Sequence, residues 1–234
     1  MSKIMGVGFL NGHKMRSLTK CRMLIKKFIE GNKVSTGTAF IDNENISLTK
    51  NFSINHESLL KENITYSIKK RIYCVINYSN PLIFSNDIVG IYDNSIKNSM
   101  TLFDYFGFVR KNIENWEDVD GEVVFKLIDH YSKVKNFNLI DATRSASQKL
   151  VGRYSCVFIS RKTPHNLWLF RNFNPMKLFC YPEAGIFMFA QERETIEKAA
   201  AAVGLHNGKE LKIPEFSGVG LNLQKNTYTT FNLF

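Results

Sequence analysis

The sequence predicts a globular α+β protein, and three observations support this class. Of its 234 residues, 44% are hydrophobic, which is enough to bury a substantial core. Short runs rich in β-branched and aromatic residues indicate strands. Segments with apolar residues at helical spacing indicate two or three amphipathic helices.

The first 80 residues contain four expected strands and one expected helix. Residues 1–9 have the pattern of a short strand, and residues 18–29 form an amphipathic helix with lysines between the apolar positions. Residues 34–42 and 46–48 are expected to be two strands joined by an Asn-rich turn. Residues 71–77 are a β-branched and aromatic run, which predicts a buried strand.

The middle of the chain is the segment around which we expect a functional site. Residues 86–96 are an apolar run that is expected to end in an Asx-rich turn. After a loop, an acidic turn leads into a helix over residues 119–130, with Asp120 suited to be its N-cap. The end of this strand and the start of this helix are expected to face one pocket.

The last third of the chain is expected to be mainly β-structure. Strands are predicted at residues 150–159 and 167–171, with a turn at 162–166 between them. A strand at 184–192 leads into a helix at 192–203, which Gly204 ends. We expect one domain over residues 1–205. Residues 206–234 are expected to be a β-like tail whose aromatic residues pack on it.

The charge of the chain indicates an acidic partner. The formal net charge is +10 and the pI is about 9.4, which favours attraction to nucleic acid or to an acidic protein. The Lys and Arg residues are nevertheless scattered, as on an ordinary solvated surface. The frequent Asn, Lys, Ile and Phe residues are typical of an AT-rich genome, such as that of a virus.

The remaining composition predicts no metal, no cofactor and no membrane association. The histidines do not pair at ligand spacing, and no Cys-x-x-Cys is formed by the four cysteines, Cys21, Cys74, Cys156 and Cys180. We therefore expect reduced, mostly buried thiols. No run approaches the roughly 18 apolar residues of a membrane span, and no signal-peptide h-region is present. We expect a cytoplasmic location, in the host cytoplasm if the protein is viral.

The order of these segments resembles the class II glutamine amidotransferase domain. This domain is the N-terminal-nucleophile (Ntn) glutaminase of glucosamine-phosphate synthase, amidophosphoribosyltransferase and asparagine synthetase B. The family opens Met-Cys-Gly-Ile-Val-Gly, and this chain places Ser2 at the nucleophile while it keeps Ile4 and Gly6. The family's His-Asn-Gly-Ile turn matches residues 92–96, and its Ser-x-Thr-Asp-Thr-Glu helix start matches residues 118–122.

The resemblance implies an Ntn-hydrolase αββα sandwich of two mainly antiparallel sheets flanked by helices. It also implies the roles of four residues. Ser2 would be the nucleophile after removal of Met1, with its own α-amine as proton acceptor. The Asn94 side chain and the Ser95 backbone N–H would form the oxyanion hole, and Asp120 would hold the amino group of glutamine.

Several family residues are altered in this chain. Ser2 replaces the nucleophilic Cys, and Lys3 replaces the Gly beside it, where its long side chain would crowd a glutamine pocket. Ser95 replaces the Gly of the oxyanion turn, so its N–H is available only if that turn tolerates a side chain. The family turn whose Arg binds the substrate carboxylate contains no Arg here; Arg71 or Arg110 would have to replace it from elsewhere.

Three functions are compatible with these residues. The first is a catalytically degenerate amidotransferase-like protein that binds a protein or nucleic acid as a binding or regulatory platform. The second is an active glutaminase or amidohydrolase that uses Ser2 and supplies ammonia to a separate partner. The third is a basic α+β nucleic-acid-binding protein, whose affinity would depend on salt. Glutamine itself is a ligand only if the pocket is intact.

Overall fold

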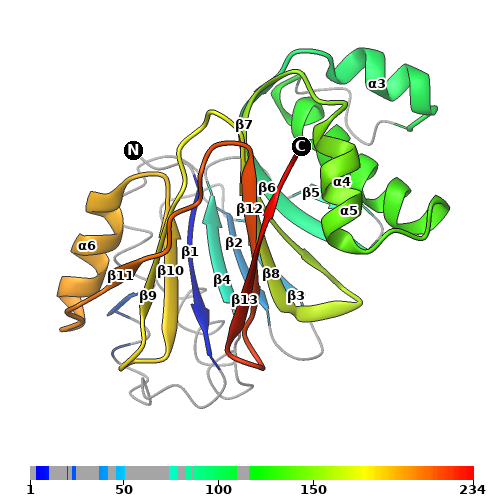
Figure 1. Ribbon diagram of the computed structural model, residues 1–234. Coiled ribbons are helices and arrows are strands. Elements are labelled where there is room, and N and C mark those ends of the chain that lie inside the picture. Colours follow the sequence, from blue (N-terminus) through cyan, green and yellow to red (C-terminus); the bar gives the residue numbers. More distant parts are fainter. Residues whose placement is uncertain are drawn as a thin grey trace.

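The computed structural model describes residues 4–10, 20, 23–24, 37–41, 46–50, 74–78, 83–85, 87–109 and 116–234, which form two stacked β-sheets flanked by helices (Figure 1). All strand pairs among these residues are antiparallel. In the described residues the first sheet has seven strands, in the order β11 (Lys209–Glu210), β9 (Lys177–Tyr181), β10 (Ile186–Ala190), β1 (Ile4–Phe9), β4 (Cys74–Tyr78), β2 (Gly37–Ile41) and β3 (Ile46–Lys50).

The second sheet places strands from the middle and the end of the chain side by side. Its six described strands follow the order β13 (Thr227–Asn232), β12 (Ser217–Asn222), β8 (Thr163–Arg171), β7 (Gly152–Ser160), β6 (Ile88–Ile96) and β5 (Ile83–Ser85). β12 pairs with β8 along its whole length, from Ser217 opposite Arg171 to Asn222 opposite Asn166. The C-terminal strands are thus members of this sheet.

The apolar layer between the two sheets follows from the period-2 pattern of the strands. In β6, Val89 and Ile91 point into this layer, where they meet Phe187 and Phe189 of β10 from the opposite sheet. Ile88 and Tyr92 point to the other face of β6, toward the helices. Each central strand is therefore apolar on both faces, as expected for a sheet that is covered on both sides.

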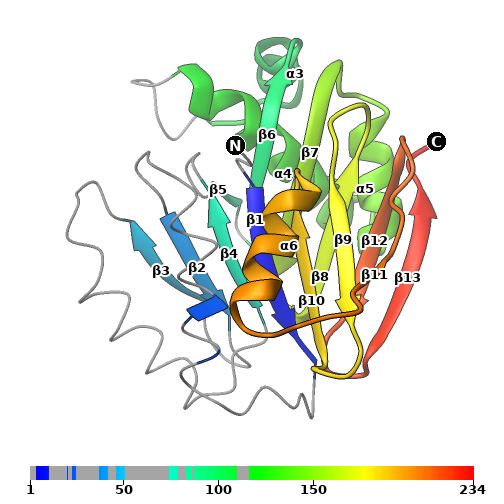
Figure 2. The ribbon, with the colours of Figure 1, turned by 90° about the vertical axis from the view of Figure 1, so that its left-hand side faces the viewer.

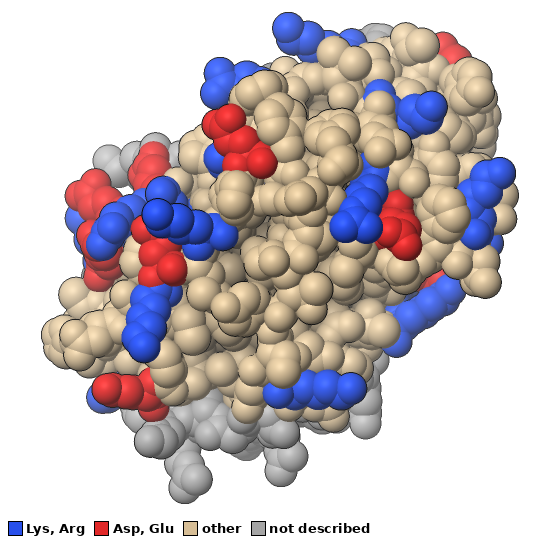
Figure 3. Space-filling view, in the orientation of Figure 1, with Lys and Arg blue, Asp and Glu red and all other residues tan. Residues whose placement is uncertain are grey.

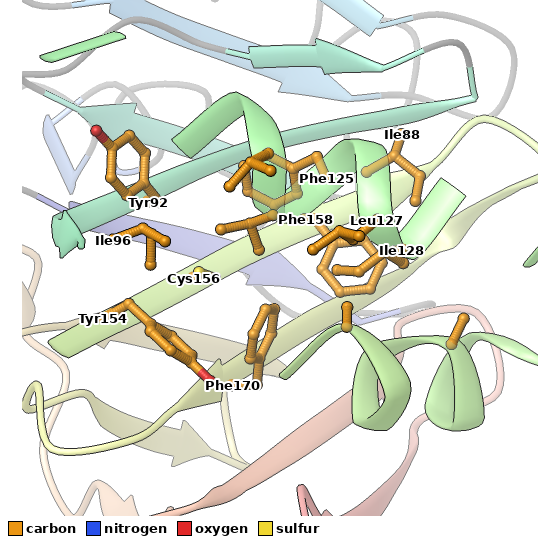
Figure 4. Packing of buried hydrophobic residues seen from close by; sticks show 14 of the residues in the cluster. Ile88, Tyr92, Ile96, Phe125, Leu127, Ile128, Tyr154, Cys156, Phe158 and Phe170 are labelled. Carbon is orange, nitrogen blue, oxygen red and sulfur yellow. The ribbon is translucent and has the colours of Figure 1, made fainter. Parts of the chain in front are cut away.

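Helices cover the outer face of the second sheet. α4 (Trp116–Val134) and α5 (Leu139–Ser147) bury their apolar sides on it, and α3 (Ser99–Phe106) packs against α4. Figure 4 shows Phe125 of α4 above Phe158 of β7, with 6.3 Å between the ring centroids. Burial of such aromatic side chains contributes much of the stability of this layer.

The outer face of the first sheet is covered by α6 (Arg193–Ala202), which lies in front of β1 and β10 in Figure 2. Ile196 of α6 and Leu24 are both fully buried in the same apolar cluster. Lys20, Met23 and Leu24 are helical, in agreement with the predicted helix over residues 18–29, whose other residues lie outside the described ones. The four layers confirm the predicted αββα sandwich.

Most of the predicted strands and the helix near residue 200 are confirmed, whereas several boundaries were wrong. α3 and α5 were not expected at all. The chain does not turn at Asn94, because β6 continues to Ile96 and stays paired with β7. α4 begins at Trp116, so Asp120 lies inside the helix and is not its N-cap. β8 begins at Thr163, which leaves only Arg161 and Lys162 for the turn before it.

Candidate functional site

The two expected oxyanion-hole residues lie near the end of β6. Asn94 is paired with Tyr154 and Ser95 with Arg153 across the β6–β7 ladder, and both side chains are exposed. The φ angle of Asn94 is +86°, in the left-handed region that Asn tolerates better than most residues. The pairing with β7 nevertheless continues through Asn94 to Ile96. Asn94 and Ser95 are therefore presented at the surface.

A buried polar cluster lies directly behind Asn94, between the two sheets. Asn174 is its centre, and its Nδ2 atom donates hydrogen bonds to Asp93 Oδ2 and to Ser155 Oγ, each at 2.9 Å. Gln191 Nε2 donates a further hydrogen bond to Asp93 Oδ2. Asp93, Ser155 and Asn174 are at most 6% exposed. Because unsatisfied polar groups are costly in such a layer, these bonds fix the positions of the cluster.

The cluster connects Asn94 to the start of β1. Asn94 Nδ2 donates to Asn174 Oδ1 at 3.4 Å, so the exposed amide contacts the buried one. Gln191 follows Ala190 of β10, which is paired with Met5 of β1. The first described residues of the chain thus enter the sandwich next to β10, the strand that Gln191 follows. Ser2, the expected nucleophile, lies outside the described residues, as do Lys3, Arg71 and Arg110.

Asp120 is held on α4 by the protein itself. Its Oδ1 atom accepts a hydrogen bond from the hydroxyl of Ser99, the buried first residue of α3. The next residue, Gly121, lies directly against the ring of Tyr92, and a Cβ atom at Gly121 would be 1.8 Å from Tyr92 Cδ1. Since Tyr92 is two residues before Asn94, α4 is in close contact with β6 beside the candidate site.

Burial controls the ionisation of the groups near the cluster. It raises the pKa of the Cys156 thiol well above its usual value, and the nearby Asp93 carboxylate adds to this effect. Burial also raises the pKa of Tyr154 to about 12. Arg171 has its pKa lowered by burial, and its guanidinium donates to the Asn174 carbonyl at 3.1 Å. Cys156 and Tyr154 are therefore neutral at physiological pH.

Two expected features of composition can be compared with the described residues. Cys156 and Cys180 are free thiols there, as predicted, whereas Cys21 is outside them. No group of His, Cys, Asp or Glu side chains in the described part of the chain is arranged to hold a metal ion. Among its helices, none is long and apolar enough to cross a membrane. On the face in Figure 3, Lys and Arg are spread out, and several lie beside acidic residues.

Sequence reasoning missed the buried cluster and the bond between Ser99 and Asp120. Asp93 carried a signal, because it occupies an inward position of β6 two residues after Ile91. A carboxylate at such a position requires hydrogen-bond donors from elsewhere in the fold. Ser155, Asn174 and Gln191 carried no comparable signal, since they meet Asp93 only after both sheets have formed.

Comparison with solved structures identifies the fold of this chain. The sequence matches no protein-family model and no curated protein. In structure, the chain is similar to glutamine phosphoribosylpyrophosphate amidotransferase from B. subtilis, with a TM-score of 0.66 and 13% identity, and to an allosteric regulatory enzyme of purine biosynthesis, with a TM-score of 0.67 and 13% identity. In both cases 99% of this chain is covered and 49% of the other, so this chain spans about half their length.

A third structure has the same extent as this chain. It is a glutamine aminotransferase class-II domain protein from Silicibacter pomeroyi, with a TM-score of 0.52, 11% identity and 98% of each chain covered. These similarities confirm that the chain has the class II glutamine amidotransferase fold that the sequence predicted. At such low identity they describe the fold alone.

Proposed function

We propose that this protein is an amidotransferase-like domain that has lost glutaminase activity and acts as a binding or regulatory platform. The class II glutamine amidotransferase fold supports the first half of this proposal. The altered residues of the expected glutamine site support the second half. We place the protein in the cytoplasm, in the host cytoplasm if it is viral.

The state of Asp120 is the observation that carries the proposal. In an active domain of this family this carboxylate is expected to hold the amino group of glutamine. Here one oxygen of the Asp120 carboxylate accepts a hydrogen bond from the hydroxyl of Ser99 in α3. This bond occupies one of the acceptor positions with which the carboxylate would bind a substrate ammonium. Because Ser99 is buried, this bond is maintained by the packing of α3.

Two substitutions visible in the sequence act in the same direction. Ser2 is a far weaker acid than the Cys it replaces, so little of it is ionised at neutral pH. The expected carboxylate-binding turn contains no Arg, which leaves the other end of glutamine without an ionic partner. A substrate that has no ionic partner at one end and meets a partly occupied carboxylate at the other gains less from proximity to the nucleophile.

Glutamate release from glutamine tests the proposal. The assay uses the purified full chain and a Ser2→Ala variant, with intact mass recorded to establish whether Met1 has been removed. We expect wild type and Ser2→Ala to release glutamate at the same background rate. A rate in wild type that is clearly higher and is lost in Ser2→Ala contradicts the proposal.

The alternative is an active amidohydrolase that uses Ser2. The exposed amide of Asn94 favours it, because Nδ2 carries two N–H groups and only one of them is used by the described residues, in the bond to Asn174. One oxyanion-hole donor typically contributes about 10²- to 10³-fold in rate. For this alternative, an Asn94→Ala variant should lose activity by about that factor.

A further inference from the structure

Six residues form a basic and aromatic surface at the end of the sandwich where β6 ends and β7 begins. We call it the end surface; it contains Lys97, Lys149, Arg153, Phe173, Phe216 and Phe234. Phe173 is 48% exposed and Phe234 is 66% exposed. The three cationic side chains are also exposed. Exposed aromatic and cationic side chains in one place are characteristic of a binding surface.

Hydrogen bonds bring the basic part of this surface together. Asn98 donates to the carbonyl of Lys149 at 2.7 Å and accepts from the backbone of Val151 at 2.9 Å. The backbone of Lys97 donates to the carbonyl of Val151 at 2.7 Å. Two residues further along β7 lies Arg153. The end of β6 and the segment leading into β7 therefore hold all three cations near one another.

The aromatic part is joined to the basic part by Asn172. Its side chain accepts from the backbone N–H groups of Tyr154 and Phe173, and it donates to the carbonyl of Gly152, each at 2.7 Å. Phe173 is thus fixed beside the start of β7, next to Arg153. Asn172 therefore joins the segment that carries Phe173 to the segment that carries Arg153.

The three phenylalanine rings form a compact group. The centroids of Phe173 and Phe216 are 4.7 Å apart, and those of Phe216 and Phe234 are 5.4 Å apart, both pairs edge to face. Phe216 has a φ angle of +56°, which is unfavourable for a bulky side chain. The backbone of Leu233 donates to the Phe216 carbonyl at 2.8 Å, which holds the C-terminal segment beside it. The fold thus keeps this ring in place despite a strained backbone.

The charge of the end surface indicates an anionic ligand. In the part of the chain that the structure describes, Lys97, Lys149 and Arg153 form no ion pair with a carboxylate. The nearby Glu215 is already 3.7 Å from Arg171. Cations without such partners attract phosphates, and exposed rings offer faces on which unstacked bases can lie.

We propose that the end surface binds single-stranded nucleic acid, with phosphates on Lys97, Lys149 and Arg153 and bases against Phe173, Phe216 and Phe234. A single strand fits better than an acidic peptide because its bases use the rings while its phosphates use the cations. It fits better than a duplex because the bases of a duplex are stacked on one another. This inference names the partner of the platform proposed above and rests on that proposal.

Fluorescence anisotropy with a labelled oligo-dT strand of about 12 nucleotides tests the inference. We expect wild type to bind at low salt, with a slope of log K against log salt of about −2 for three phosphate contacts. Arg153→Glu should reduce the size of this slope by about 0.7. Phe173→Ala should weaken binding by about fivefold or more and leave the slope unchanged.

Lys225→Glu and Tyr228→Ala are the matched controls. Both residues are exposed; Lys225 lies in the β12–β13 turn and Tyr228 near the start of β13, at the other end of the sandwich from the C-terminus (Figure 1). We expect both variants to bind as wild type does. Absence of binding, equal losses in the controls, or equally tight binding of a labelled duplex or polyglutamate would overturn the inference. Glutamate release would instead overturn the proposed function and leave the strand binding intact, so the two failures are distinguishable.

Discussion

Substitution of Gly121 by Ala tests the contact between α4 and β6 beside the candidate site. In a helix this change normally stabilises a protein by up to about 1 kcal/mol. Here the new Cβ would be 1.8 Å from Tyr92 Cδ1 and 1.9 Å from Cε1, whereas ordinary contacts begin near 3.4 Å. The helix or the buried ring must therefore move by about 1.6 Å, from the difference between these distances.

The magnitude follows from the two opposing effects. Overpacking of a buried site costs about 1 to 3 kcal/mol, and a displacement of this size belongs at the upper end. After subtraction of the helix gain, we expect Gly121→Ala to lower the free energy of unfolding by about 2 kcal/mol. For a chain of this length this lowers the melting temperature by about 4 to 8 °C.

Urea denaturation followed by circular dichroism measures this free energy, and a Tyr92→Ala background is the control. Without the ring, Gly121→Ala should be neutral or should stabilise by up to about 1 kcal/mol, so the sign of the effect reverses. If Gly121→Ala stabilises the otherwise unchanged protein, the packing of Tyr92 on Gly121 described above is wrong.

Three further predictions concern the residues around Asn94. Asn174→Ala removes one hydrogen bond from buried Asp93 and one from buried Ser155, and it should lower the free energy of unfolding by about 1 to 3 kcal/mol. Urea denaturation measures this change, and an unchanged midpoint would contradict the presence of these two hydrogen bonds. Asn94→Ala should be less stable than Asn94→Gly by about 1 kcal/mol, because the φ angle of +86° favours Gly; equal stabilities would argue against this backbone angle. Stability should fall between pH 10 and pH 12, because the unfolded chain loses the Tyr154 proton near pH 10 while the folded protein keeps it to about 12. Tyr154 contributes about 2 to 3 kcal/mol to this loss, and the loss should be smaller by that amount in Tyr154→Phe, in which Tyr131 and Tyr181, whose pKa values are also raised by burial, still contribute.

The resemblance to the family predicted the sandwich, whereas local signals predicted only the strands within it. β6 and β7 are apolar and β-branched over most of their length, and the order of segments carries the family resemblance. α5 was missed because it is short and buries the small residues Ala142 and Ala146 rather than a conspicuous apolar stripe. α3 was missed because its aromatic residues do not distinguish a helix from a strand.

The site was less predictable than the fold because its contacts are long-range. The bonds from Asn174 and Gln191 to Asp93 span 81 and 98 positions in the sequence. Asn94 was predicted to lie in a turn at the end of the strand, because its left-handed backbone and the continuation of β6 to Ile96 depend on pairing with β7. The contact of Ser99 with Asp120 likewise depends on the packing of α3, which local patterns did not reveal.

The loss of glutaminase activity is the central claim, and glutamate release by a Ser2→Cys variant tests it most directly. This variant restores the family nucleophile and changes nothing else, provided that intact mass shows Met1 to be removed. We predict that it stays at the background rate of Ser2→Ala, because Asp120 remains bonded to Ser99 and the expected carboxylate-binding turn still lacks an Arg. Restored glutamate release in Ser2→Cys would show that the glutamine pocket is intact and would contradict the account.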